Sequence, residues 1–105
     1  MKKEIWLDMD GTIADLYGVD NWLEYIKAED EKPYKIAKPL VNMKNLAKEL
    51  NRLQKQGWTI GVITWLAKNG KPEYNDRVTR VKLNWLEEHL NDFQFDVVHI
   101  VEYGT

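Results

Sequence analysis

The feature that most constrains the fold of this chain is an apolar stretch, Ile5–Asp8, that continues as Met9-Asp10-Gly11-Thr12. Consecutive residues of buried-strand character predict a β-strand. Strand side chains alternate, so Asp8 and Asp10 share a side if the strand continues. Two carboxylates at such a short separation repel each other unless a cation lies between them.

The acidic pair therefore predicts a divalent metal with oxygen ligands, most naturally Mg²⁺ held by Asp8 and Asp10. Gly11 permits a tight turn that a bulkier residue would disfavour. The alternative is a strand that simply ends in an acidic turn, which an Asp-Gly pair also favours. The two interpretations differ in whether other parts of the chain bring complementary groups to the same place.

Length and composition restrict the class of protein. A chain of 105 residues is expected to form one domain, 1–105. Its net charge of −2 gives no electrostatic case for binding a nucleic-acid polymer. The absence of cysteine excludes a disulfide framework, a thiolate metal site and a cysteine nucleophile. No apolar run approaches the ~18 residues of a membrane span, so we expect a cytoplasmic protein with no membrane partner.

The remaining pattern alternates helices and strands. Helices are predicted over 19–27, from an N-cap at Asn42 to Gly57, and over 76–90, with strands over 58–64 and 96–101. Residues 28–39 and 67–75 are expected to be mostly loop. Alternation of this kind predicts an α/β domain with a Rossmann-like parallel sheet. Ligands in such sheets bind beyond the carboxyl ends of the strands, where Asp8, Asp10 and Thr64 are expected.

Two further residues are candidates for the same site. Thr64 follows an apolar run and offers a hydroxyl for an anion, although threonine is also an ordinary strand residue. Lys82 lies inside the apolar stripe of its helix, so it must extend to solvent or find an anion. A lysine directed at the two carboxylates is a good partner for a phosphate and for Asp8. His89 and His99 have no ligand spacing and are expected to be structural or surface residues.

Asp8-Met9-Asp10-Gly11-Thr12, Thr64 after an apolar strand and Lys82 on the next helix resemble the first three motifs of the haloacid dehalogenase-like hydrolase superfamily. The spacing Lys82-Leu83-Asn84-Trp85 is most similar to the 5'(3')-deoxyribonucleotidase branch and its small phage and bacterial relatives. The resemblance implies that Asp8 is the nucleophile that forms an aspartyl-phosphate and Asp10 the general acid and base. Thr64 would bind the phosphoryl oxygens, and Lys82 would neutralise Asp8 and the phosphate.

The same resemblance implies a Mg²⁺ ion, with the backbone carbonyl of Asp10 among its ligands. It also implies that residues 19–40 form a small helical cap over the site. Aromatic residues that would then stack on a nucleobase are Trp22, Tyr25, Tyr34 and Trp65. The expected function is a Mg²⁺-dependent phosphohydrolase acting on small phosphomonoesters, chiefly nucleoside monophosphates.

The chain departs from the family pattern after Val101. The superfamily's fourth motif, one or two aspartates at the end of a further strand, has no counterpart here. Asp92 and Asp96 do not replace it, because they flank the start of the last predicted strand, at the wrong end of the sheet. We therefore expect weaker metal affinity and turnover than in complete relatives. Without C-terminal strands, Ile5–Asp8 becomes an open sheet edge, which favours a homodimer or a complementing chain.

Two alternatives remain open from the sequence. The chain is either naturally short or a truncated product. Correspondingly, the runner-up function is a catalytically weak or dead relative that serves as a phosphate- or nucleotide-binding or interaction module. Asp8, Asp10, Thr64 and Lys82 favour the enzyme, whereas the missing fourth motif favours the module.

Overall fold

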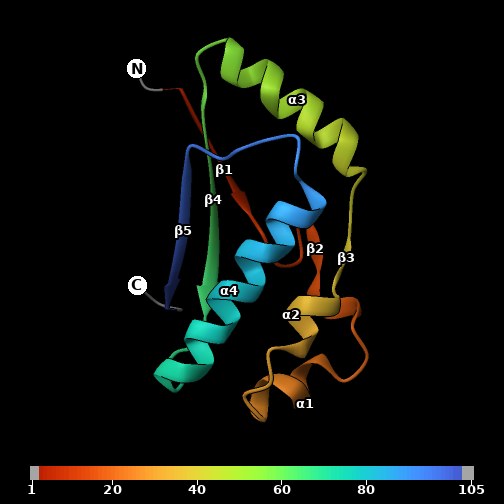
Figure 1. Ribbon diagram of the computed structural model, residues 1–105, viewed down its shortest axis with the longest axis vertical. Helices are drawn as coiled ribbons and strands as arrows, with labels where there is room; N and C mark the ends of the chain where they lie inside the picture. The colour runs from red at the N-terminus through yellow and green to blue at the C-terminus, as the bar shows by residue number, and fades with distance from the viewer. Residues whose placement is uncertain (1–2, 103–105) are drawn as a thin grey trace.

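The computed structural model describes residues 3–102 as a mixed α/β fold around a three-stranded parallel sheet (Figure 1). The strand order is β1-β4-β5, and a separate two-stranded antiparallel sheet joins β2 to β3. The elements are β1 (Glu4–Asp8), β2 (Ala14–Asp15), the 3-10 helix η1 (Leu16–Gly18), α1 (Trp22–Lys27), α2 (Lys32–Ile36), β3 (Lys38–Pro39), α3 (Met43–Lys55), β4 (Thr59–Leu66), α4 (Pro72–His89) and β5 (Val97–Glu102).

The sheet order explains where the long helices lie. Crossovers between parallel strands are right-handed, and both β1 to β4 and β4 to β5 step in the same direction across the sheet. α3 and α4 therefore cover one face (Figure 1). Ile60 and Val62 of β4 are fully buried beneath them, Ile60 packing with Leu50 of α3 and Val62 with Trp85 of α4. The predicted parallel α/β architecture is confirmed.

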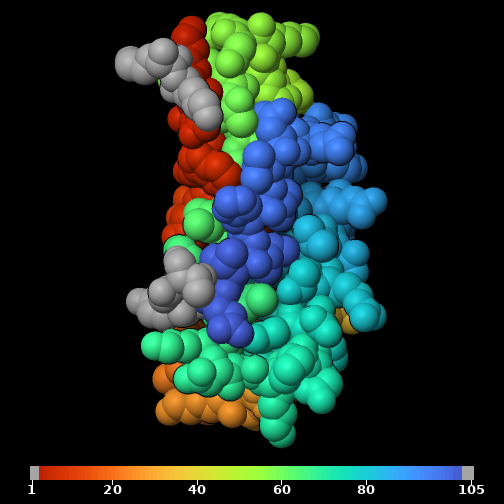
Figure 2. Space-filling view, turned by 90° about the vertical axis from the view of Figure 1, so that its left-hand side faces the viewer, coloured from red at the N-terminus to blue at the C-terminus, as the bar shows by residue number. Residues whose placement is uncertain are grey.

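The opposite face of the sheet carries no helix among the described residues. Figure 2 views this face, on which β1, β4 and β5 lie side by side. Trp6 is 41% exposed there and lies across Gly61, where an added Cβ would come within 2.5 Å of the indole. Its ring also contacts His99, with ring centroids 5.1 Å apart. β1 forms one edge of the three-stranded sheet, as predicted.

The predicted helix from Asn42 is confirmed as α3. The Asn42 side chain accepts a hydrogen bond from the Asn45 N–H at 3.1 Å, which caps the first turn. The backbone turns away after the helix at Gly57, whose φ is +96°. No described helix combines the length and the apolar character that crossing a bilayer requires.

Two predicted loops are wrong in part. Residues 32–36 form α2, because Pro33 lies in the first turn, where a proline costs no hydrogen bond. For the same reason α4 begins at Pro72 rather than near residue 76. The first cap helix begins at Trp22 instead of residue 19, after Asn21 adopts a left-handed conformation with φ of 62°.

Strand β4 extends two residues beyond Thr64 and ends at Leu66. The extension follows from pairing, since Thr64, Trp65 and Leu66 lie opposite Ile100, Val101 and Glu102 of β5. Thr64 therefore lies inside the strand, not at its end.

Candidate functional site

A cavity of about 370 Å³ opens beyond the carboxyl end of β1, between the sheet and the segment from η1 to α2. Asp8 and Asp10 lie at its sheet side, and apolar and aromatic side chains form the rest of its wall. The lining residues are Asp8, Asp10, Leu16, Tyr17, Trp22, Ile26, Tyr34, Trp65, Leu66 and Ala67. The structure thus brings the acidic pair together with three of the four aromatic residues predicted to bind a base, Trp22, Tyr34 and Trp65.

The turn after β1 places the two carboxylates in different surroundings. Asp8 is the last strand residue and its side chain is exposed, with no hydrogen bond from any residue between 3 and 102. Met9 turns into the core, where it is 1% exposed. Gly11 then adopts a φ of +82°, and a Cβ there would lie 2.8 Å from the Tyr17 ring. The predicted need for glycine is confirmed.

Asp10 is held in place by a cation and a hydroxyl. Its Oδ2 accepts a hydrogen bond from Lys82 Nζ at 2.9 Å and one from Thr64 Oγ1 at 3.2 Å. The Asp10 side chain is 13% exposed, whereas that of Lys82 is 0% exposed. Lys82 was expected to pair with Asp8, but its direct partner in the structure is Asp10.

The Lys82 ammonium uses all three of its N–H groups. Besides Asp10, it donates to Thr64 Oγ1 at 2.6 Å and to the Trp65 carbonyl at 2.7 Å. The Trp65 carbonyl was not predicted, because a backbone acceptor leaves no signal in residue type. Thr64 is completely buried and both accepts from Lys82 and donates to Asp10. The convergence of these residues favours a site over a simple acidic turn.

Burial lowers the pKa of Lys82, because the low-dielectric interior disfavours the charged ammonium. The charge and hydrogen bond of Asp10 oppose this shift, and the more distant charge of Asp8 opposes it less. Burial also raises the pKa of Tyr34, whose neutral phenol is favoured near the Asp10 carboxylate. The site therefore holds one buried cation against one partly buried anion.

The donors available for a metal are the Asp8 carboxylate and the oxygens of Asp10. Within residues 3–102, no three His, Cys, Asp or Glu side chains are arranged so that they could hold a metal ion together. Carboxylate and carbonyl oxygens are hard ligands of the kind Mg²⁺ takes, and Mg²⁺ commonly keeps several waters and a substrate phosphate besides one or two carboxylates. The free Asp8 carboxylate fits such an ion in chemical type.

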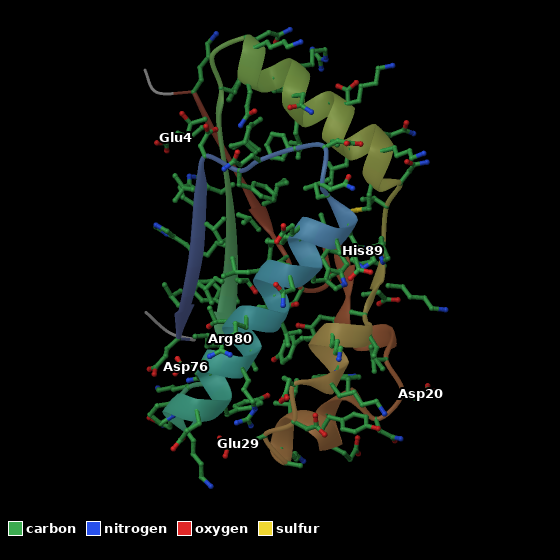
Figure 3. All side chains as sticks on the ribbon, viewed as in Figure 1. Glu4, Asp20, Glu29, Asp76, Arg80 and His89 are labelled. Atoms are coloured by element: carbon green, nitrogen blue, oxygen red, sulfur yellow. The ribbon has the colours of Figure 1, made fainter. Side chains whose placement is uncertain are left out.

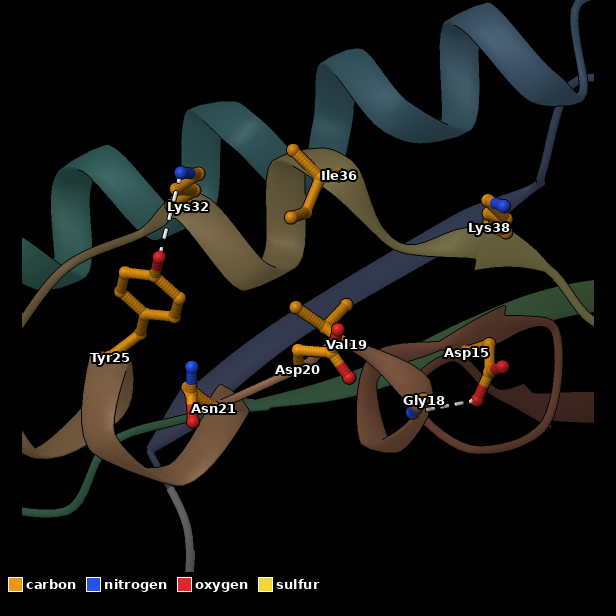
Figure 4. Close-up of a pocket in the computed structure, with 9 residues that line it drawn as sticks. All are labelled: Asp15, Gly18, Val19, Asp20, Asn21, Tyr25, Lys32, Ile36 and Lys38. Atoms are coloured by element: carbon orange, nitrogen blue, oxygen red, sulfur yellow. Dashed lines mark hydrogen bonds between the residues drawn. The ribbon is translucent and has the colours of Figure 1, made fainter.

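Tyr25 lies elsewhere. It lines a different cavity of about 520 Å³, together with Asp15, Lys32 and Lys38 (Figure 4). Its hydroxyl is 3.5 Å from Lys32 Nζ. Trp22 remains in the site cavity, where it contacts Tyr17 edge to face with ring centroids 4.9 Å apart. The sequence does not single out Tyr17, because its place in the cavity follows from the 3-10 helix η1 after β2.

The other residues weighed from the sequence are structural. His89 packs on Trp85 with ring centroids 4.4 Å apart, and His99 packs on Trp6. Asp96 precedes β5 and accepts from the Ile60 N–H at 2.7 Å, near the amino end of β4. It lies at the end of the sheet away from Asp8, as expected.

Comparisons with models of known protein families and with curated protein sequences find no match to this chain. The relation to the haloacid dehalogenase-like hydrolases therefore remains a prediction from its motifs, beside an observed Rossmann-like α/β fold.

Proposed function

We propose that the protein is a Mg²⁺-dependent phosphohydrolase of the haloacid dehalogenase-like type, acting in the cytoplasm on small phosphomonoesters through an aspartyl-phosphate. Residues 19–40, which include α1 and α2, serve as its cap. The observation that carries the proposal is the division of roles in the acidic pair. The Asp8 carboxylate is exposed at the cavity and accepts no hydrogen bond within residues 3–102, while Asp10 is fixed by Lys82 and Thr64.

In the proposed reaction an Asp8 carboxylate oxygen attacks phosphorus and the bond from phosphorus to the leaving oxygen breaks. For this step Asp10 carries a proton on Oδ1, while its Oδ2 stays on Lys82 and Thr64. Oδ1 donates that proton to the leaving oxygen, which departs as an alcohol. Asp10 then removes a proton from a water molecule that attacks the aspartyl-phosphate, which restores Asp8 and releases phosphate. Lys82 and Thr64 hold Asp10 in reach of both proton transfers.

Asp8 and Asp10 are the residues that would hold Mg²⁺, and a bound ion would offset the repulsion between the Asp8 carboxylate and the phosphate. This contribution is electrostatic. The Lys82 ammonium adds a second positive charge on the Asp10 side of the site.

The cavity supports nucleoside monophosphates as the substrate class. Its volume of about 370 Å³ lies near the lower end of the range for small-molecule sites, roughly 300–1,000 Å³. Trp22 and Trp65 offer aromatic surface beside the carboxylates, which suits a flat base attached to a phosphate. A mononucleotide fits these dimensions better than a longer nucleic acid.

The proposal is tested by phosphate release from a generic phosphomonoester and a panel of nucleoside monophosphates, with Mg²⁺. Asp8→Asn keeps the shape of the side chain and removes the nucleophile, so hydrolysis should fall by about three orders of magnitude or more. Asp92→Asn, a substitution at an exposed aspartate remote from the cavity, is the matched control and should match wild type. Equal, slow release by wild type and Asp8→Asn would overturn the enzyme proposal.

The second candidate is a catalytically weak or inactive protein that binds phosphate, nucleotide or another chain. One face of the parallel sheet is covered by no helix of residues 3–102, and this favours the second candidate, because parallel sheets are usually covered on both faces. The unpaired edge of β1, among the described residues, adds backbone groups that a homodimer or complementing chain could pair. Nucleotide binding by wild type without Asp8-dependent release would support this candidate.

A further inference from the structure

The Lys82 ammonium has an aromatic neighbour in addition to its three hydrogen-bond acceptors. Asp10, Thr64 and the Trp65 carbonyl accept its three N–H groups. The ring of Tyr34 lies over the same ammonium, with Nζ 4.7 Å from the ring centroid. This distance is within the range of a cation–π contact, which is strongest where water is excluded. Lys82 has no exposed surface.

Tyr34 reaches this position from the cap. It belongs to α2, is 9% exposed and packs in one cluster with Leu16, Tyr74 and Val78. Tyr74 and Val78 are on α4, the helix that also carries Lys82. The same Tyr34 side chain lines the cavity beside Asp8 and Asp10. One cap residue therefore touches both the cavity and the buried cation.

We propose that Tyr34 is a positioning residue whose ring shields the Lys82 ammonium from water and so keeps it on Asp10 and Thr64. The contact between Tyr34 and Lys82 is observed. Only its consequence for catalysis rests on the proposed function. Tyr34 is thereby assigned to the cation rather than to the nucleobase. Without the ring, water would reach the ammonium and compete for its N–H groups.

The assignment links the cap to the chemistry. A group that fills the cavity contacts Tyr34, and Tyr34 in turn covers the cation that fixes Asp10. The packing of α2 against the core and the orientation of Asp10 are therefore coupled through the Tyr34 ring. Lys82 acts through Asp10 in this arrangement, because its three N–H groups are already used within the protein.

The test measures how fast Lys82 is acetylated by acetic anhydride at one fixed pH, quantified by peptide mass spectrometry relative to the exposed Lys48. Tyr34→Leu removes the ring and should raise the relative rate about tenfold, the effect of losing one water-excluded cation–π contact. Tyr34→Phe keeps the ring and should restore protection. Tyr74→Leu is the matched control, since it makes the same change in the same cluster at a ring not over Lys82.

Unchanged labelling in Tyr34→Leu overturns the inference, as does an equal increase in Tyr74→Leu or Tyr34→Phe. Circular dichroism shows whether each variant is folded, and Tyr34→Met, which fills the same space without an aromatic ring, replaces Tyr34→Leu if that variant does not fold. Labelling does not depend on hydrolysis. Ring-dependent protection without Asp8-dependent phosphate release would therefore support the role of Tyr34 and contradict the proposed function alone.

Discussion

At the scale of single residues, Lys82 determines the electrostatics of the site. A fully buried ammonium is tolerated because it has three hydrogen-bond acceptors and a nearby carboxylate. Its location within an apolar stripe predicts that it must find an anion, and the structure identifies that anion as Asp10. The cost of burial remains visible as a pKa below the ordinary lysine value of 10.5.

This pKa direction gives a stability prediction with a definite sign. Folding lowers the pKa of Lys82, so between the folded pKa and 10.5 the unfolded chain binds more protons than the folded protein does. The free energy of unfolding therefore increases as the pH rises through that window. The gain is complete above 10.5 and is lost as pH falls through the folded pKa. Urea unfolding of wild type and Lys82→Met is measured from pH 7 to 10.5. The difference between their free energies of unfolding isolates the contribution of Lys82.

Burial raises the pKa values of Tyr34 and Tyr74, so the stability that these tyrosines contribute is lost only at high pH. Wild type and Lys82→Met share this contribution. The difference between the two free energies of unfolding, plotted against pH, therefore follows the titration of Lys82. A difference that stays flat or falls with increasing pH contradicts the assignment.

At the scale of elements, the turn between α1 and α2 is fastened to α4. The Glu31 carboxylate accepts from Arg77 Nε at 3.1 Å, and the Glu29 carbonyl accepts from the same guanidinium at 3.2 Å. The Glu29 carboxylate also accepts from the Lys71 N–H at 3.0 Å, just before α4 begins. Figure 3 shows Glu29 below the first half of α4. These contacts hold α2, and with it Tyr34, against the core.

Arg77→Ala should loosen α2 without unfolding the protein. Arg77 is 47% exposed in its pair with Glu31, so water and salt screen the pair and the free energy of unfolding should fall by less than about 1 kcal/mol. Amide hydrogen exchange in residues 32–37 should increase several-fold while α3 is unchanged. Arg80→Ala, on the same helix and without a bond to a described residue, should leave exchange in residues 32–37 as in wild type. Equal protection in the two variants would show that these contacts do not hold α2.

At the scale of the whole molecule, the sheet is one-sided. Because both crossovers lie on the same face, the side chains of Trp6, Ile63 and Val97 remain on a face that no described helix covers. Each of these residues is at least partly exposed. A partly exposed apolar face on a parallel sheet favours association with another chain.

Sedimentation at micromolar concentration tests this expectation. We expect a species larger than the 12.4 kDa monomer, or a monomer that gains stability with a complementing chain. Trp6→Lys should weaken the association, because it places a charge in the centre of the apolar face. Leu23→Lys is the matched control, since Leu23 is 42% exposed but lies on α1. A well-folded wild-type monomer at micromolar concentration would rule the homodimer out.

The sequence alone predicted the parallel α/β fold, helix α3, the turn at Gly11 and the approach of Thr64 and Lys82 to the acidic pair. These features depend on local periodicity, on capping and on backbone freedom, which are properties of neighbours in the chain. It missed α2 and the early start of α4, because a proline in a first helical turn resembles one in a loop.

Only the tertiary structure decided which partners meet. The pairing of Lys82 with Asp10 instead of Asp8 and the position of Tyr34 over the ammonium depend on contacts between segments far apart in the chain. The separation of Tyr25 from the site depends likewise on how the cap folds onto the core. Residue types show which charges need partners, whereas distances between side chains determine which partner each one finds.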